Sequence, residues 1–422
     1  MTEARAGFGV SSITPRVGAE LAGYRYHRPS AGVHDELHSR ALVMEGDGSI
    51  WALSTNELCW IGSSAVALIR KKVAERTPIP ESNIFVCAVH THSGPRDDNA
   101  EDWDRPLADL VADAIVQAYE NRVPARVGTG RGRLDEWSIN RRFIDRSTDP
   151  GMAVLKVEDL NGTLLGTVVN WNCHAVVLGY DNLLISADFP GLASAQLEEQ
   201  MGDGAVALYI NGGAGDVNPL TSGVQDRLSG EYAVDTHVPG HCYYGTAEAK
   251  PRFRLCDRGG GTFEEAEALG QAVAQEAWKI TRTIQVGAVS RAPWIRSAHV
   301  QIRPARAPAI EVLGRETWRN WTGKAEIMAL GVDELAMIGE PGEVFCETAL
   351  LFKRRLWQMG FGVPMTSGYA NGYFSYLPPS EAFAEGGYEV EWARKLSLRE
   401  DLQTAMWEAI EGLIPHVEQQ VS

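Results

Sequence analysis

"FVCAVHTHSGP", residues 85–95, places two histidines one residue apart after an apolar run that is typical of a buried strand. Because side chains alternate along a strand, His90 and His92 are predicted to face the same side. Gly94 and Pro95 then end any regular element. The stretch therefore predicts a strand that delivers two imidazoles to a site open to solvent.

Segments with strand-like and helical spacing alternate on both sides of this stretch. Strands are predicted within 40–46, 49–58, 83–92, 153–159, 163–174 and 205–216, and a strand, a loop and a helix within 333–356. Helices are predicted over 63–76, 106–122, 262–281 and 398–413. This alternation predicts an α/β fold, a layered mixed β-sheet flanked by helices with a site at strand ends. We expect one domain over residues 1–422, with a long loop insertion at 221–261 that forms a lid, a binding loop or a disordered segment.

Composition and charge exclude several classes of protein. The 422 residues are 44% hydrophobic, which is enough for a large core. The sequence contains no window of about 18 apolar residues, the length that a membrane-spanning helix needs. The formal charge of −16 disfavours nucleic acid and anionic membrane surfaces as partners. The glycine-rich stretches 128–133 and 211–216 match no phosphate-binding motif. Six cysteines without a CxxC pair, and an N-terminus without an apolar signal, lead us to expect a reducing, cytoplasmic location.

Residues that can ligate a metal stand at several of the predicted strand ends. His174 ends one apolar run, Asn211 and Asp216 flank a glycine loop after another, and Glu343 is predicted to open a helix just after a third. Each of these residues alone could equally be a hydrogen-bonded core residue. Together with His90 they supply two histidines and a carboxylate, the donor set of a catalytic zinc site that keeps one position open for water.

Several motifs, in order, resemble the neutral, non-lysosomal ceramidases, which are zinc amidases. The motifs are "GFGVSSITPRVGAELAGY" (7–24), "GVHDELHSRALVM" (32–44), "HTHSGP" (90–95), "INRR" (139–142), "NWNCHAVVLG" (170–179), "SADFPG" (186–191), "GGAGDVNP" (212–219), "GEPGEVF" (339–345) and "GYANGYFSYLPP" (368–379). Their order along most of the chain makes the resemblance specific to this superfamily.

The resemblance implies one zinc ion per chain and a role for each matching residue. It implies these zinc ligands: His90, His174, Glu343 and Tyr376. His92 would be the second imidazole, beside the reacting carbonyl, and Arg141 and Tyr388 would line the scissile amide. Tyr369 and Tyr373 are interpreted as packing residues.

The sequence also departs from the ceramidases. Asn218 stands where they carry serine, which excludes a hydroxyl nucleophile at this position. Arg96, Asp97 and Asp98 replace glycines and put charge where a lipid chain would need apolar walls. The export signal and the C-terminal β domain of that family are also missing from the sequence given. We therefore expect a soluble, polar or short-chain amide as the substrate.

The resulting hypothesis is a zinc-dependent amide hydrolase in which metal-activated water attacks the carbonyl. His92 is the candidate for proton transfer to the leaving nitrogen. Asp188 either orients a histidine or is a charge at a helix N-terminus. Asn211, Asp216 and Asn218 are assigned to the shell that supports the ligands or to the substrate loop. The alternatives are an esterase or lactonase that uses the same site, and a binding protein that has lost activity; the oligomeric state is left open.

Overall fold

The computed structural model describes residues 4–24, 27–143, 146–202, 204–221, 261–304, 323–415 and 417. The strands are β1 (Arg5–Ser12), β2 (Gly32–Val33), β3 (His38–Gly46), β4 (Ser49–Asn56), β5 (Ile84–Ala88), β6 (Val123–Arg133), β7 (Ser138–Asn140), β8 (Gly151–Asp159), β9 (Leu164–Trp171), β10 (Leu184–Ile185), β11 (Val206–Asn211), β12 (Val217–Pro219), β13 (Trp294–Gln301), β14 (Lys324–Val332), β15 (Leu335–Gly339), β16 (Glu343–Val344), β17 (Val363–Ser367) and β18 (Tyr376–Leu377). The helices are α1 (Ser63–Ala74), α2 (Leu107–Glu120), α3 (Asp188–Met201), α5 (Phe263–Thr283), α7 (Cys346–Gln358), α8 (Ser380–Glu385), α9 (Tyr388–Lys395) and α10 (Leu402–Glu411), with short 3₁₀ turns η1 (Glu81–Asn83) and η2 (Ala100–Asp102). The predicted insertion at 221–261 lies outside the described residues except for its two ends.

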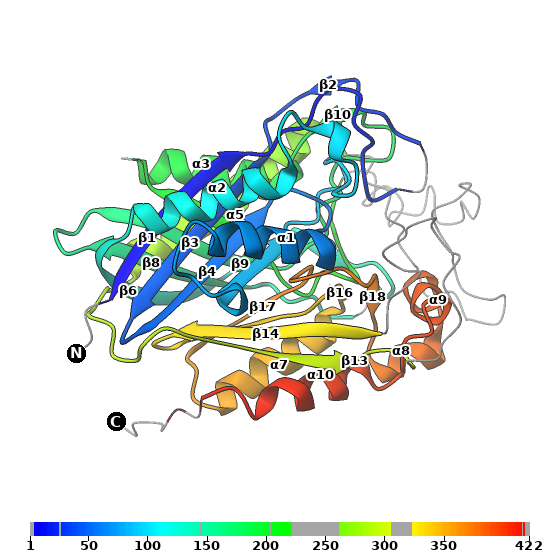
Figure 1. The fold of residues 1–422 in the computed structure, drawn as a ribbon. Coiled ribbons are helices and arrows are strands. Elements are labelled where there is room, and N and C mark those ends of the chain that lie inside the picture. The colour runs from blue at the N-terminus through cyan, green and yellow to red at the C-terminus, as the bar shows by residue number, and fades with distance from the viewer. Residues whose placement is uncertain are drawn as a thin grey trace.

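Two sheets pack against each other and are covered by helices on both outer faces (Figure 1). The large sheet has the strand order β11-β9-β8-β6-β1-β3-β4-β5, and it is mixed because only the β11–β9 and β4–β5 pairs at its two edges are parallel. The smaller sheet has the order β13-β14-β15-β17. Helices α1, α2, α3 and α5 cover the outer face of the large sheet, and α7 and α10 cover that of the smaller one. The predicted α/β class with a mixed sheet flanked by helices is confirmed.

Alternation along the central strands explains why there are two packed sheets. In β3, Leu42 and Met44 face the smaller sheet, whereas Ala41 and Val43 face helices α1 and α2. Both faces of such a strand are buried, so its sequence is a continuous apolar run. This double burial brings the ends of strands from both sheets to the same region of the molecule.

Local predictions hold where turn and cap residues decide the structure. The 40–46 and 49–58 strands pair antiparallel around Gly46-Asp47-Gly48, and Asp47 and Gly48 both have the positive φ that a tight hairpin requires. The capping box of Thr262 and Glu265 is present at the start of α5. The glycine-rich stretch 128–133 is part of β6, where a Cβ at Gly128 or Gly130 would collide with Ile284 at the end of α5. Those glycines therefore serve close helix packing.

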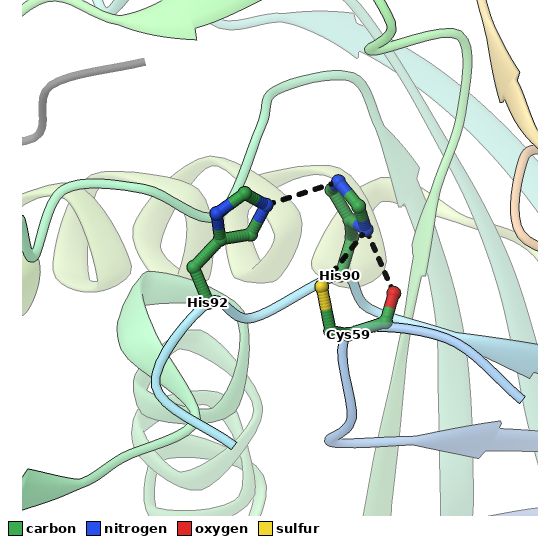
Figure 2. Close-up of side chains that lie close together, drawn as sticks. All are labelled: Cys59, His90 and His92. Carbon is green, nitrogen blue, oxygen red and sulfur yellow. Dashed lines mark hydrogen bonds between the residues drawn. The ribbon is translucent and has the colours of Figure 1, made fainter. Parts of the chain in front are cut away.

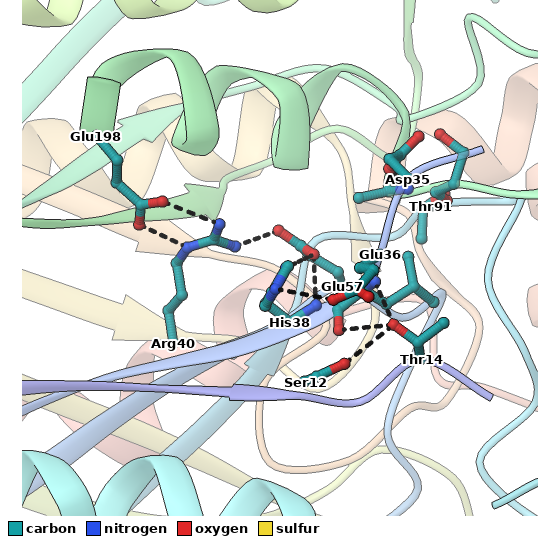
Figure 3. Close-up of polar contacts among 12 residues, drawn as sticks. Ser12, Thr14, Asp35, Glu36, His38, Arg40, Glu57, Thr91 and Glu198 are labelled. Carbon is teal, nitrogen blue, oxygen red and sulfur yellow. Dashed lines mark hydrogen bonds and ion pairs between the residues drawn. The ribbon is translucent and has the colours of Figure 1, made fainter. Parts of the chain in front are cut away.

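A buried ion-pair network fixes the segment after β4, which contacts the histidine stretch (Figure 3). Arg40 on β3 bridges Glu57 and Glu198 of α3, and its Nε lies 2.8 Å from the Glu198 carboxylate. Burial alone would raise the pKa of Glu57, but Arg40 and His38 hold it below its usual value. Since Glu57 is two residues from Cys59, the network anchors a segment that contacts His90.

Glu340, between β15 and β16, is a buried carboxyl whose two oxygens accept no hydrogen bond from the residues that the structure describes. Burial raises its pKa well above the usual value, although Lys353 acts in the opposite direction. The folded state therefore holds the Glu340 proton more tightly than the unfolded state. The free energy of unfolding should fall as the pH rises from about 4.3, the usual pKa of glutamate, toward the raised value.

Glu340→Gln should remove this contribution, because the amide does not ionise. We expect urea unfolding between pH 5 and 8 to show a flatter pH dependence for the variant, by up to about 1.4 kcal/mol per pH unit. The exposed Glu381→Gln of α8 is the matched control and should keep the wild-type slope. Identical slopes for Glu340→Gln and wild type would contradict this account of Glu340.

Candidate active site

His90 was predicted to lie on a strand. In the structure it lies on the turn that follows the strand instead. β5 ends at Ala88, and His90 adopts a positive φ of 71°. Its backbone N–H donates to the Leu58 carbonyl at 2.9 Å. The two-residue period therefore does not explain why His90 and His92 lie together; the turn brings their Nε2 atoms to 3.2 Å.

Backbone carbonyls orient two of the imidazoles. The Nδ1–H of His90 donates to the Cys59 carbonyl at 2.7 Å (Figure 2), and that of His174 donates to the Ala214 carbonyl at 2.7 Å. Burial, with the charges of Arg141 and the other two histidines, lowers the pKa of His174 well below its usual value. A neutral imidazole that donates through Nδ1 keeps its lone pair on Nε2. Both residues therefore present a metal-ligating nitrogen inward.

These two nitrogens meet one carboxylate oxygen. Nε2 of His90 lies 3.0 Å from Nε2 of His174, and each lies 3.4 Å from Oε2 of Glu343. This oxygen is buried and accepts no hydrogen bond from the described residues. Three electron-rich atoms at such spacing repel each other unless a cation lies among them. Ligand atoms about 2.0–2.1 Å from a tetrahedral zinc are about 3.3 Å apart, so the three residues fit this ion.

A second group of possible ligands, Cys59, His90 and His92, overlaps the first (Figure 2). Its Cys59 Sγ lies 3.6 Å from Nδ1 of His90. Since that nitrogen donates its proton to the Cys59 carbonyl, it has no lone pair for a metal. The set of His90, His174 and Glu343 is therefore the candidate metal site.

Arg141 borders this site and is fully engaged. Its guanidinium donates to Glu389 through Nε at 2.9 Å and to the Tyr376 hydroxyl through Nη2 at 3.0 Å. Its Nη1 lies 3.3 Å from Oδ1 of Asn218 and 3.4 Å from Nε2 of His174. A buried positive charge thus stands beside the candidate metal site.

The tyrosines of the 368–379 segment differ in what they contact. Tyr376 pairs with Glu343 between the parallel strands β18 and β16, and its hydroxyl accepts a hydrogen bond from Arg141; its role as a ligand stays a prediction. Tyr369 stacks on the His90 ring at 4.0 Å, as expected of a packing residue. Tyr373 was interpreted as a packing residue, but its hydroxyl donates a hydrogen bond to Oε1 of Glu343. It holds the carboxylate whose other oxygen faces the histidines.

A cavity of about 300 Å³ opens onto these residues. It is bordered by His90, His92 and Glu343 on one side and by Tyr388 and Trp392 of α9 on another. Tyr388 therefore lines the same cavity as the two histidines, and its role toward a substrate stays a prediction. Its ring meets that of Tyr376 edge to face at 5.6 Å.

Asn211 joins the two histidine segments. Its side-chain amide donates to the carbonyls of Val89 at 3.0 Å and Cys173 at 2.9 Å, and its Oδ1 accepts from the Cys173 N–H. Val89 and Cys173 directly precede His90 and His174. Asn211 therefore ties together the backbone segments that lead into the two histidines.

Asp216 and Asp188 hold backbone segments and not imidazoles. Asp216 accepts from Asn140 and from the Cys346 N–H at the start of α7, each at 2.8 Å. Asp188, the first residue of α3, accepts from the backbone N–H groups of Leu178 and Phe189, and burial raises its pKa to about 7. Both of these donors are backbone N–H groups, so the contacts do not show Asp188 orienting a histidine. Glu343, predicted to open a helix, instead lies in β16, three residues before α7.

Several functional contacts were missed by sequence reasoning. Glu389, which pairs with Arg141, was not predicted. Its position next to Tyr388 in the sequence was a signal that could have identified it. Gly23 lies against His92, where a Cβ would come 2.3 Å from the ring. The carbonyls of Cys59 and Ala214 belong to the backbone and leave no signal in residue type.

Two imidazoles and a carboxylate beside a cavity, in a layered α/β fold, are the arrangement found in metal-dependent hydrolases. In the sequence comparison, the family described as "Neutral/alkaline non-lysosomal ceramidase, N-terminal" matches residues 5–303. The chain belongs to the neutral/alkaline non-lysosomal ceramidase family.

Individual relatives are similar at low identity. Neutral ceramidase B of Dictyostelium discoideum is 26% identical over 347 residues, which cover 71% of this chain and 47% of the relative. Neutral ceramidase of Pseudomonas aeruginosa is 26% identical over 247 residues, covering 51% and 37%. The chain spans about half the length of its first curated relatives.

Solved structures support the fold. The crystal structure of the Pseudomonas aeruginosa neutral ceramidase superposes with a TM-score of 0.74 at 20% identity, over 98% of this chain and 75% of that chain. A structure described as "Ceramidase complexed with C2" gives a TM-score of 0.75, also at 20% identity, over 100% and 77%. Within the described residues, no helix has the length and apolar character needed to cross a bilayer.

Proposed function

We propose that this chain is a zinc-dependent hydrolase of amide bonds. The observation that carries the proposal is the convergence of His90, His174 and Glu343 at 3.0–3.4 Å, with one buried carboxylate oxygen facing both imidazoles. Tyr376 is the fourth residue proposed to hold the ion. When bound, zinc would supply a Lewis acid that activates water and polarises an amide carbonyl.

The surrounding residues would act on the substrate directly. His92 borders the cavity and is proposed to pass a proton to the leaving nitrogen, a role suited to an imidazole. Arg141 and the Tyr388 hydroxyl are proposed to stabilise the negative charge that develops on the carbonyl oxygen. Asn218 accepts from Arg141 and offers no nucleophile, so water is the nucleophile of this proposal.

The supporting contacts would preserve this geometry during turnover. Tyr373 fixes one oxygen of Glu343, so the other stays directed at the histidines. Glu389 neutralises part of the Arg141 charge and holds the guanidinium in place. Burial of all four proposed ligands limits the competing water around them.

The proposed substrate is a small, polar or short-chain N-acyl amide. The cavity of about 300 Å³ is at the lower end of the range for ligand pockets, and one arginine, Arg96, stands in its wall. The relatives are named neutral ceramidases, so ceramide itself is the comparison substrate.

The four described cysteines, Cys59, Cys87, Cys173 and Cys346, are buried and free, which supports the proposal of a reducing, cytoplasmic location.

A chain-length series tests this function. The zinc-loaded protein should hydrolyse short N-acyl amides with a kcat/KM at least about tenfold above that for long-chain ceramide in mixed micelles, because each methylene beyond the cavity gains no burial. Chelated protein is the control and should be inactive on both. Ceramide as the best substrate by tenfold would contradict the substrate proposal. Esters or lactones cleaved in place of amides would favour the esterase alternative, and no turnover of any kind would favour a binding protein.

A further inference from the structure

The loop after His92 carries one cation into the wall of the cavity. Arg96 lines the cavity together with His92, and its backbone is fixed by an N–H bond to the Glu20 carbonyl at 3.2 Å. The preceding residue, Pro95, pairs with Leu21 in an isolated β-bridge. Two backbone contacts with residues 20–21 thus hold the backbone of Arg96 in place.

The neighbouring acids do not share this position. Asp97 turns its carboxylate to the Trp60 indole N–H at 3.1 Å and to the Gly62 N–H, at the start of α1, at 2.6 Å. Asp98 is exposed and does not line the cavity. The three-charge stretch that we expected beside the histidines therefore contributes a single positive charge to the cavity.

Arg96 is distinct among the residues around it. It is the one arginine or lysine in the described lining, and its guanidinium forms no ion pair or hydrogen bond with any described residue. The one lining carboxylate, Glu343, is committed to Tyr373 and the two histidines. Most of the other lining side chains are aromatic: Tyr24, Trp60, Tyr373, Tyr376, Tyr388 and Trp392.

We propose that Arg96 binds a carboxylate on the amine half of the substrate, and that the substrates are N-acyl amino acids. This inference rests on the proposed amide hydrolysis. A guanidinium presents two parallel N–H donors that match a carboxylate, and a wall of aromatic rings strengthens that contact by excluding water. Arg96 and His92 line the same cavity, and because His92 is the proposed proton donor to the leaving nitrogen, we assign the carboxylate to the amine half.

The reaction balances without a further reactant. Water adds to the carbonyl carbon, the C–N bond breaks, and the nitrogen takes up a proton. The products are a carboxylic acid and a free amino acid. A cavity of about 300 Å³ has room for a short acyl group and one amino acid side chain.

The test compares N-acetyl-L-phenylalanine with N-acetylphenethylamine, which differs only by lacking the carboxylate. Titration calorimetry with the zinc-loaded protein should show about tenfold to a hundredfold tighter binding of the acid, the usual range for a charge-assisted pair. Arg96→Ala should reduce this preference to about twofold or less, and Arg96→Lys should keep part of it. Arg126→Ala, at an exposed position of β6 outside the cavity, is the matched control and should bind like wild type.

Kinetics provide the second readout. The same preference should appear in kcat/KM for acetate release, and Arg96→Ala should lower kcat/KM on the acid at least about fivefold more than on the neutral amide, because only the acid has a carboxylate for Arg96 to bind. Equal binding of the two probes by wild type, or a preference that survives Arg96→Ala, would overturn the inference. Hydrolysis without any preference defeats this inference alone. A protein that binds the acid through Arg96 but hydrolyses no amide defeats the proposed function instead.

Discussion

Replacing His174 with alanine is expected to remove both the bound zinc and the hydrolytic activity. The substitution deletes one of the three electron-rich atoms that converge at 3.0–3.4 Å, and the Ala214 carbonyl that orients the ring cannot replace it. Loss of a residue that only orients a ligand costs about 10–100-fold in metal affinity, and loss of the ligand itself should cost more. Elemental analysis of the purified variant and an amide-hydrolysis assay measure the two effects.

The exposed His299→Ala on β13 is the matched control, because it removes an imidazole far from any proposed ligand in sequence and outside the cavity lining. It should retain about one zinc per chain, the stoichiometry proposed for a single site. Circular dichroism of both variants separates loss of metal from loss of fold. A folded His174→Ala that keeps zinc and wild-type turnover would contradict the assignment of this ligand.

His92→Ala should behave differently, since His92 is proposed to move a proton and not to hold the metal. We expect zinc to be retained and turnover to fall by roughly 10²–10⁴, the range for general acid–base groups. The geometry makes this a stringent prediction, because Nε2 of His92 is only 3.2 Å from Nε2 of His90. Loss of zinc equal to that in His174→Ala would make His92 a ligand, and unchanged turnover would remove it from the mechanism.

Gly23 offers a way to move the His92 ring without deleting it. A Cβ at Gly23 would lie 2.3 Å from the ring, so Gly23→Ala should displace the imidazole and lower turnover while zinc stays bound. Gly18→Ala is the matched control. Gly18 has a similar φ, +102° against +90°, but nothing lies within 4 Å of its would-be Cβ. The control therefore carries the same backbone strain without the contact.

The sequence was sufficient to predict the donor set but not how it is held. Histidine and glutamate at the ends of apolar runs are visible as residue types, and a metal site at strand ends follows from the α/β class. The order of motifs identified Arg141, Tyr376 and Tyr388 through resemblance. Their convergence depends on contacts between segments more than 200 residues apart, which no local pattern contains.

Three features could not be predicted, for physical reasons. The two-residue period assumes a continuous strand, but β5 ends at Ala88 and His90 takes a left-handed turn because its N–H bonds to Leu58. Tyr373 and Tyr369 stand in one aromatic segment, and only tertiary packing decides that the first bonds Glu343 while the second stacks on His90. The packing of two sheets face to face follows from strands buried on both sides, which a single sequence does not distinguish from strands between two helical layers.

The central claim is that His90, His174 and Glu343 hold a metal ion, and metal analysis of the unmodified protein tests it most directly. Protein purified without chelator should contain about one zinc per chain by inductively coupled plasma mass spectrometry, as a site with three or four protein ligands predicts. Dialysis against a chelator followed by zinc titration should restore the same stoichiometry. Protein that carries no transition metal as purified, and binds no added zinc at micromolar concentration, would contradict the account.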